Sequence, residues 1–117
     1  MTDITLDNKD IKLAASVYGL TNGEPIPFMH GTSLIRDTWP EIAERLMNRR
    51  RVWTLDFRGH GNSDRAPSYE LVGYVSDAET VSAEIARPAV IVGHSLGGCV
   101  AGVLAQSGSC KCAHRLP

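Results

Sequence analysis

The pentapeptide GHSLG at residues 93–97 has the pattern G-x-S-x-G, which limits the folds open to this chain. It follows a β-branched apolar run, residues 89–92, and precedes residues 96–106, which are mostly small and apolar. The first segment is typical of a strand buried on both faces of a parallel sheet, and the second of a helix packed closely on that sheet. A sharp strand-to-helix turn between them would place the central serine in a strained conformation with its hydroxyl exposed.

Glycine is expected on both sides of this turn because the flanking backbones approach too closely for a Cβ atom. Gly93 and Gly97 satisfy that requirement, and Gly98 extends the strip of small residues into the helix. The spacing therefore predicts direct backbone packing between the turn and the rest of the sheet.

Ser95 is the candidate nucleophile of this turn. The helix N-terminus directs its dipole at the serine, and the backbone N–H of Leu96 can face a developing oxyanion. His94 adjoins Ser95, but adjacent side chains on a sharp turn point apart, so we predict that His94 packs rather than acts as a base. A chance pentapeptide is the alternative, and the strand before it and the helix after it favour the functional interpretation.

A second candidate element is His30-Gly31-Thr32, at the end of the apolar run of residues 26–29. A backbone N–H directly after such a strand can supply the second donor of an oxyanion hole, and by position Thr32 would carry it. An ordinary glycine turn is the alternative, since a His-Gly pair alone is a weak signal. Its place before the GHSLG turn makes the interpretation more specific.

A third motif, DFRGHGNSD at residues 56–64, holds two glycines separated by one residue. A dinucleotide-binding loop needs a third glycine three positions later, where this chain has Asp64. We therefore interpret the segment as a structural turn in which Asp56 and Arg58 tie the loop to the sheet.

The rest of the chain reads as strands followed by alternating strands and helices, which predicts an α/β fold with right-handed β-α-β crossovers. An antiparallel hairpin is expected over residues 4–18, with a polar turn at residues 7–10. A capping box, with Thr38 as the cap and Glu41 three positions later, predicts the start of the first helix. The other expected elements are a strand at residues 52–55 and a helix over residues 69–86.

Composition narrows the function classes. A net charge of −1 offers no footprint for nucleic acid or an anionic membrane. Arg49-Arg50-Arg51 could form a phosphate patch, but we interpret it as a solvated helix end that enters a strand. No apolar run reaches the ~20 residues of a membrane span, and no signal peptide is recognisable. Three cysteines without an export signal suggest free thiols in the cytoplasm. Cys110, Cys112 and His114 could in principle bind a soft metal, but they lack a four-ligand pattern, so we expect neither metal nor cofactor.

The motifs FMHG, DFRGHGNSD and VIVGHSLGG, in this order and at these separations, resemble those of the α/β-hydrolase superfamily. The resemblance is nearest to its esterase, lactonase and haloperoxidase-like branch, and it runs from about Ile4 to Gln106. It implies a small-molecule ester, lactone or related carbonyl substrate attacked by Ser95, with Thr32 and Leu96 as backbone oxyanion donors. A serine at this position argues against the epoxide-hydrolase and dehalogenase branches, whose nucleophile is a carboxylate.

The chain departs from the family after the nucleophile. The family's catalytic triad runs in the order Ser, Asp or Glu, then His. Here the last acidic residue, Glu84, precedes Ser95. The only histidine after Ser95, His114, lies in residues 107–117, where we find no helical or strand period. We therefore expect residues 1–106 to be a partial α/β-hydrolase domain followed by an unmatched tail, produced by C-terminal truncation. A naturally short relative is the alternative.

Truncation would also leave the sheet incomplete, with no strand to pair the far edge of residues 90–92 and with exposed backbone groups there. Two function classes follow from these observations. The first is a serine hydrolase of carbonyl substrates. The second is a catalytically inactive fragment that acts at most as a binding or interaction module. The sequence does not specify the substrate, the triad acid and base, or the oligomeric state.

Overall fold

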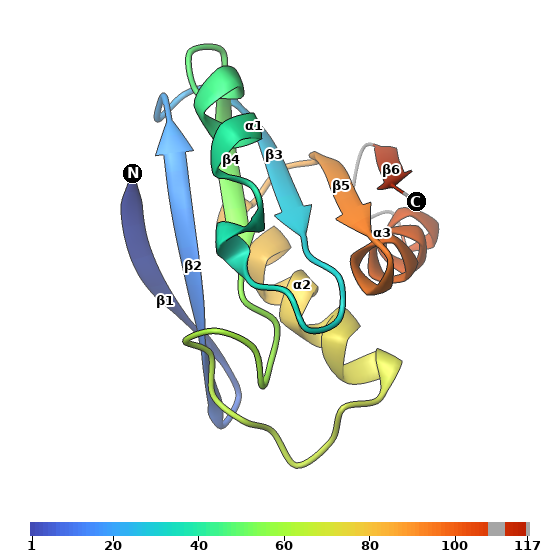
Figure 1. Ribbon diagram of the computed structural model, residues 1–117. Coiled ribbons are helices and arrows are strands. Elements are labelled where there is room, and N and C mark those ends of the chain that lie inside the picture. The colour runs from blue at the N-terminus through green and yellow to red at the C-terminus, as the bar shows by residue number, and fades with distance from the viewer. Residues whose placement is uncertain (108–111, 117) are drawn as a thin grey trace.

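A mixed sheet flanked by helices forms the framework of the molecule (Figure 1). The computed structural model describes residues 1–107 and the backbone of residues 112–116. The strands are β1 (Thr2–Asn8), β2 (Ile11–Gly19), β3 (Glu24–Met29), β4 (Arg50–Leu55), β5 (Val90–His94) and β6 (Cys112–Leu116). The helices are the short 3₁₀ turn η1 (Arg36–Thr38), α1 (Pro40–Leu46), α2 (Leu71–Ile85) and α3 (Leu96–Gln106).

The strand order across the sheet is β1-β2-β4-β3-β5-β6. The first pair is the expected hairpin, antiparallel with Asn8 opposite Ile11, and β2 is also antiparallel to β4. From β4 onward every neighbouring pair is parallel, so the later strands and helices form β-α-β units as predicted. The carboxyl ends of β3 and β5 consequently lie side by side at one edge of the sheet.

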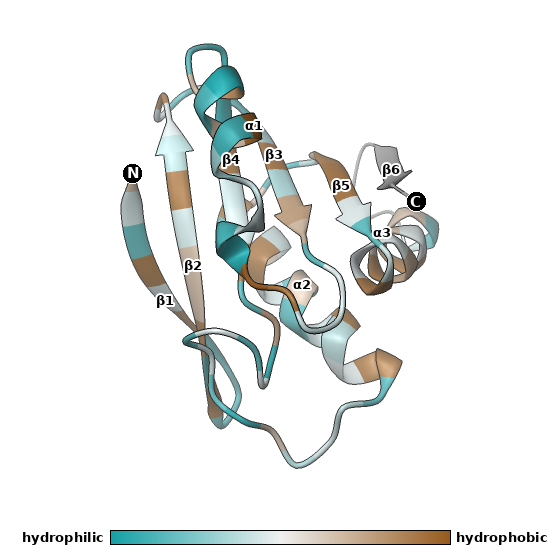
Figure 2. Ribbon diagram, in the orientation of Figure 1, coloured by the Kyte–Doolittle hydropathy of each residue, from teal (hydrophilic) through white to brown (hydrophobic). Residues whose placement is uncertain are grey.

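Side chains of successive residues on the inner strands enter two separate hydrophobic clusters, because a strand directs them to opposite faces. Phe28 and Val52 pack with Ala43 of α1 on one face, whereas Met29 and Trp53 pack with residues of α2 and α3 on the other. Figure 2 shows the hydrophobic colour along β3 and β5, between these helices. The sheet is thus covered on both faces where the candidate motifs lie.

The expectation that residues 90–92 lack a partner on their far edge is wrong. Strand β6 pairs with β5 in parallel register, from Val90 opposite Cys112 to His94 opposite Leu116. Strand pairing uses backbone N–H and C=O groups, so it does not require the apolar alternation that residues 107–117 lack. This places β5 inside the sheet, and β1 and β6 form its two edges among the described residues.

The predicted capping box at Thr38 is also wrong. Thr38 ends η1, and the residue that caps α1 is Trp39, without a side-chain hydrogen bond to the helix. The Trp39 side chain is buried and its ring lies 5.1 Å from the Phe28 ring, so aromatic packing sets the start of the helix. Pro40 occupies the first helical turn, as expected.

Over the described residues, none of the helices combines the length and the apolar character required to cross a bilayer.

Candidate active site

Ser95 stands at the junction between β5, which ends at His94, and α3, which begins at Leu96. Its backbone has φ 54° and ψ −111°, a combination that is strained for any residue with a side chain. The residue is exposed, and its carbonyl accepts the Cys99 N–H at 3.1 Å as the helix begins. The predicted strained turn with an exposed serine is therefore present.

The two glycines of the turn pack backbone against backbone. A Cβ atom on Gly93 would lie 2.2 Å from the Gly97 carbonyl oxygen. A Cβ atom on Gly97 would lie 2.0 Å from the carbonyl oxygen of Met29, the last residue of β3. Gly98 is buried beside them. The expected close approach of the backbones is thus confirmed, and it packs the start of α3 directly against the end of β3.

The segment after β3 forms a turn against this junction. The Leu34 N–H donates to the Gly31 carbonyl at 3.1 Å, and Ser33 within the turn has φ 67°. A Cβ atom on Gly31 would lie 2.8 Å from Nδ1 of His94 and 3.3 Å from the His94 carbonyl oxygen. The residue just before Ser95 therefore touches the turn that carries Thr32.

Two backbone N–H groups are available at this edge. Thr32 is exposed, and its N–H makes no hydrogen bond within the described part of the chain. Leu96 is the first residue of α3, where an N–H has no acceptor inside the helix. Because Thr32 follows β3 and Leu96 follows β5, adjacent parallel strands bring these two candidate donors to the same side of the sheet.

His30 is fully buried and serves as a structural link rather than a base. Its Nε2 accepts the Phe57 N–H at 3.0 Å, so Nδ1 carries the proton and donates to the Gly31 carbonyl at 2.7 Å. Burial lowers the pKa of His30 below its ordinary value of 6.5, which stabilises this neutral form. His30 thus joins the loop after β3 to the loop after β4.

His94 is half-buried, with its ring against Gly31. This contact agrees with the predicted packing role.

The loop at residues 56–64 is tied to neighbouring segments by its own polar groups. Asp56 is buried, accepts the Asn62 N–H at 2.9 Å and receives hydrogen bonds from the Arg36 backbone and guanidinium. Asp64 accepts the Lys12 N–H of β2 at 2.8 Å. The segment is therefore a structural turn, as expected.

The prediction that Arg58 ties the loop to the sheet is wrong, because Arg58 makes no hydrogen bond to a strand in the described part of the chain. Its guanidinium instead pairs with the buried carboxylate of Asp77 on α2, with Nη2 2.9 Å from Oδ1. The Arg58 backbone N–H also donates to Asp77, at 3.0 Å. Asp77 was not among the predicted residues, and the available signal was its position one and four residues before Ala78 and Val81 of the apolar helical stripe.

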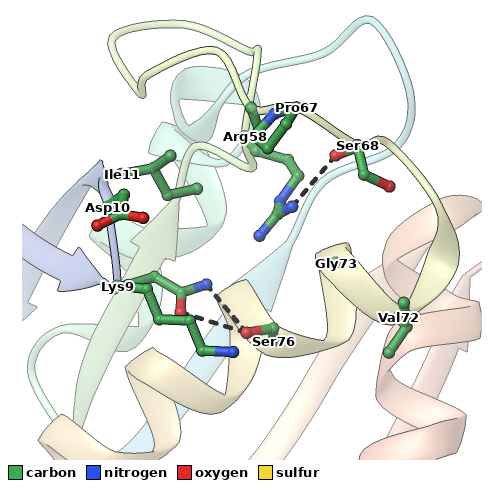
Figure 3. A pocket seen from close by; sticks show the side chains of 11 residues that line it. Lys9, Asp10, Ile11, Arg58, Pro67, Ser68, Val72, Gly73 and Ser76 are labelled. Atoms are coloured by element: carbon green, nitrogen blue, oxygen red, sulfur yellow. Dashed lines mark hydrogen bonds between the residues drawn. The ribbon is translucent and has the colours of Figure 1, made fainter.

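Two cavities in the described part of the chain lie away from Ser95. The larger, about 300 Å³, opens between the β1–β2 turn and the start of α2 (Figure 3). Its polar wall includes Ser76, which hydrogen-bonds Asn8, and Arg58, which donates to the Ser68 carbonyl at 3.1 Å. A second cavity of about 260 Å³ lies beside Trp53 and Arg87. Neither of these two cavities is lined by the turn at residues 93–97 or by Thr32.

In the described part of the chain, no group of three or more His, Cys, Asp or Glu side chains could hold a metal ion. The alternative site at Cys110, Cys112 and His114 lies outside the residues whose side chains are described. Residues 96–117 contain no Asp or Glu. The described site therefore provides a serine hydroxyl and two backbone donors.

A sequence model of the Alpha/beta hydrolase family matches residues 28–114, which extends beyond Gln106 into the expected tail. The mouse (Mus musculus) sn-1-specific diacylglycerol lipase ABHD11 is 31% identical over 106 residues, covering 85% of this chain and 34% of the relative. The non-heme chloroperoxidase of Streptomyces lividans is 34% identical over 84 residues, covering 69% of this chain and 30% of the relative. The chain thus spans about a third of the length of these curated relatives.

Solved structures reproduce the arrangement of the strands and helices. The thioesterase domain from the curacin biosynthetic pathway superposes with a TM-score of 0.92 at 24% identity, covering 99% of this chain and 46% of that domain. An epoxide hydrolase from Vigna radiata superposes with a TM-score of 0.90 at 21% identity, covering 99% of this chain and 39% of the enzyme. At these identities the likeness concerns the fold alone.

Proposed function

The chain belongs to the alpha/beta hydrolase family, and from this membership we propose that it contributes the nucleophilic half of a serine hydrolase site. The observation that carries the proposal is Ser95, held exposed at φ 54° between a buried strand and a helix N-terminus. A serine hydroxyl in that position can attack a carbonyl carbon once a base removes its proton. The reaction is acyl transfer to water through a covalent acyl-serine intermediate.

The backbone N–H groups of Thr32 and Leu96 would stabilise the oxyanion formed in that attack. Among the described residues neither group has a hydrogen-bond acceptor, and both follow the carboxyl ends of adjacent strands. Removing one oxyanion donor typically lowers kcat by about 10²–10³. Because the donors are backbone groups, their contribution depends on how firmly the turns that carry them are held.

The proposed substrate class is a small-molecule ester, lactone or related carbonyl compound. Several curated relatives are named for ester cleavage, among them the mouse diacylglycerol lipase and Esterase YbfF of Escherichia coli, 32% identical over 78 residues. The Vigna radiata epoxide hydrolase is similar at the level of the fold. A serine at position 95 supports carbonyl substrates over epoxides, whose hydrolases use a carboxylate nucleophile. No cofactor enters this chemistry.

An inactive form is the second candidate, because residues 96–117 supply no carboxylate to orient a base. By themselves the 117 residues would then retain at most the acceleration due to the oxyanion donors, roughly 10³ over the reaction in water. Such a segment would act as a binding or interaction module.

We also propose a reducing compartment, the cytoplasm. Cys99 is an exposed free thiol on α3, and such thiols persist where disulfides are kept reduced.

The test compares Ser95→Ala and His94→Ala with wild type in the natural gene product that contains these residues. The two measurements are hydrolysis of p-nitrophenyl butyrate and labelling by a fluorophosphonate probe. We expect Ser95→Ala to abolish labelling and to lower turnover by as much as ~10⁶, as for the nucleophile of a well-studied serine protease. His94→Ala should mainly lower stability.

Equal labelling of Ser95→Ala and wild type would show that the nucleophile is another residue. Wild-type protein that is folded, unlabelled and inactive toward esters would favour the second candidate.

A further inference from the structure

The turn of residues 31–34, which carries Thr32, makes a further contact with a histidine that the proposed mechanism does not use. The Ser33 N–H donates to Nε2 of His60 at 3.1 Å. The other ring nitrogen, Nδ1, lies 2.9 Å from the Arg58 carbonyl oxygen, to which only a protonated nitrogen can donate. His60 therefore binds as a neutral ring with the proton on Nδ1, and both of its nitrogens are occupied.

The peptide that His60 contacts determines the form of the turn. Gly31 to Leu34 closes by an N–H to carbonyl bond, with φ 67° at Ser33 and no positive φ at Thr32, which is the type II pattern. Type I and type II turns differ by a flip of the central peptide, and the N–H of that peptide belongs to Ser33. A residue with a side chain, such as Ser33, disfavours the positive φ of the type II turn and so favours type I. Another contact must therefore stabilise the type II form.

His60 is held in place by its own backbone hydrogen bonds. The His60 N–H donates to the Phe57 carbonyl at 2.9 Å, and the His60 carbonyl accepts the Ser63 N–H at 3.0 Å. The centroid of the His60 ring lies 5.0 Å from that of the His30 ring. His30 in turn is hydrogen-bonded to the Gly31 carbonyl and the Phe57 N–H. Two histidine rings thus hold consecutive parts of one turn to the loop after β4.

We propose that His60 is a positioning residue, which fixes the Thr32–Ser33 peptide in the type II orientation and thereby holds the backbone of Thr32, whose N–H on the preceding peptide is the candidate donor to the substrate oxyanion. The inference rests on the proposed function of Ser95 and Thr32. It assigns a role to a histidine that could be mistaken for the general base. His60 does not fit that role, because neither ring nitrogen is free to accept the Ser95 proton.

The test uses His60→Gln and His60→Leu in the natural gene product. Glutamine can place its side-chain oxygen near the position of Nε2 and accept the Ser33 N–H, whereas leucine fills similar space without an acceptor. The first measurement is hydrogen exchange of the Ser33 amide, with the Leu34 amide as the internal reference. The second is the rate of fluorophosphonate labelling of Ser95, separated into the binding constant and the maximal rate.

We expect the Ser33 amide of His60→Leu to exchange about tenfold faster than in wild type. Its maximal labelling rate should fall at least about tenfold with little change in the binding constant, because oxyanion donors act on the transition state. His60→Gln should recover most of both values. Urea unfolding of each variant identifies any general loss of stability.

Equal Ser33 exchange in the two variants, or a labelling rate that glutamine fails to restore, would overturn the role of His60. If wild-type protein is not labelled at Ser95, the serine proposal fails separately. The exchange measurement then still decides whether His60 holds the turn.

Discussion

Replacing Gly97 by alanine should destabilise the protein, whereas the same replacement at Gly102, five residues later in the same helix, should not. A Cβ atom on Gly97 would lie 2.0 Å from the Met29 carbonyl oxygen, 2.5 Å from its carbonyl carbon and 2.8 Å from its Cβ. A Cβ atom on Gly102 meets nothing within 4 Å. The pair therefore separates the effect of backbone contact at the turn of residues 93–97 (the elbow) from the general preference of a helix for alanine.

The loss of stability in Gly97→Ala depends on which atoms must move to make room for the new Cβ atom. Overpacking a core typically costs 1–3 kcal/mol, and here two of the three nearest atoms belong to the backbone of β3 and cannot rotate away. We expect a loss near the upper limit, about 3 kcal/mol, for Gly97→Ala. At Gly102 alanine should stabilise the helix by up to ~1 kcal/mol. At roughly 4 °C per kcal/mol for a domain of this size, Tm should fall by about 12 °C in the first variant and rise by about 4 °C in the second.

The assay is thermal and urea unfolding followed by circular dichroism at 222 nm, on wild type and both variants in one buffer. Fluorophosphonate labelling of Ser95 adds a functional measurement, because a displaced start of α3 also displaces the serine and the Leu96 N–H. If Gly97→Ala is as stable as Gly102→Ala, the close packing of the elbow against β3 is refuted.

Two further predictions concern buried polar groups. Because burial lowers the pKa of His30 below 6.5, the unfolded chain gains a proton before the folded chain does, so the free energy of unfolding should fall as pH drops from about 7 through 6.5. Urea unfolding at pH 7.5 and 5.5 checks this, and an unchanged pH dependence in His30→Gln would contradict it. Arg58→Leu leaves the Asp77 carboxylate buried without its cation and should cost about 3–5 kcal/mol. Recovery in the double variant Arg58→Leu/Asp77→Leu supports that cause, whereas Lys12→Ala, at an exposed ion pair, should unfold like wild type.

Local sequence was sufficient for the elbow because its constraints act between near neighbours. The turn at Ser95 needs a strand before it, a helix after it and small residues on both sides, and all three are visible within about twenty positions. The same holds for the hairpin of β1 and β2, whose polar turn and flanking apolar residues are adjacent in the chain. Such features could be predicted with nearly correct boundaries, including those of α3.

The predictions that were wrong concern residues whose contact partners are distant in the sequence. Strand β6 is recognised by its pairing with the backbone of β5, and backbone groups carry no sequence signal of their own. A local motif predicts Thr38 as the cap of α1, but the cap is Trp39, whose ring is buried against Phe28 of β3. In both cases tertiary contact outweighed local preference.

The candidate site divides in the same way. The sequence alone predicts Ser95, Thr32 and Leu96 as a candidate set, since each occupies a fixed place relative to its own strand. The tertiary structure decided what holds the set together: the contact of Gly31 with His94, and the bond from Ser33 to His60. Ser33 and His60 are 27 residues apart in the sequence, and Gly31 and His94 are 63 residues apart. Hydrogen bonds and van der Waals contacts act over a few ångströms in space, whatever the separation along the chain, so only the folded molecule could reveal them.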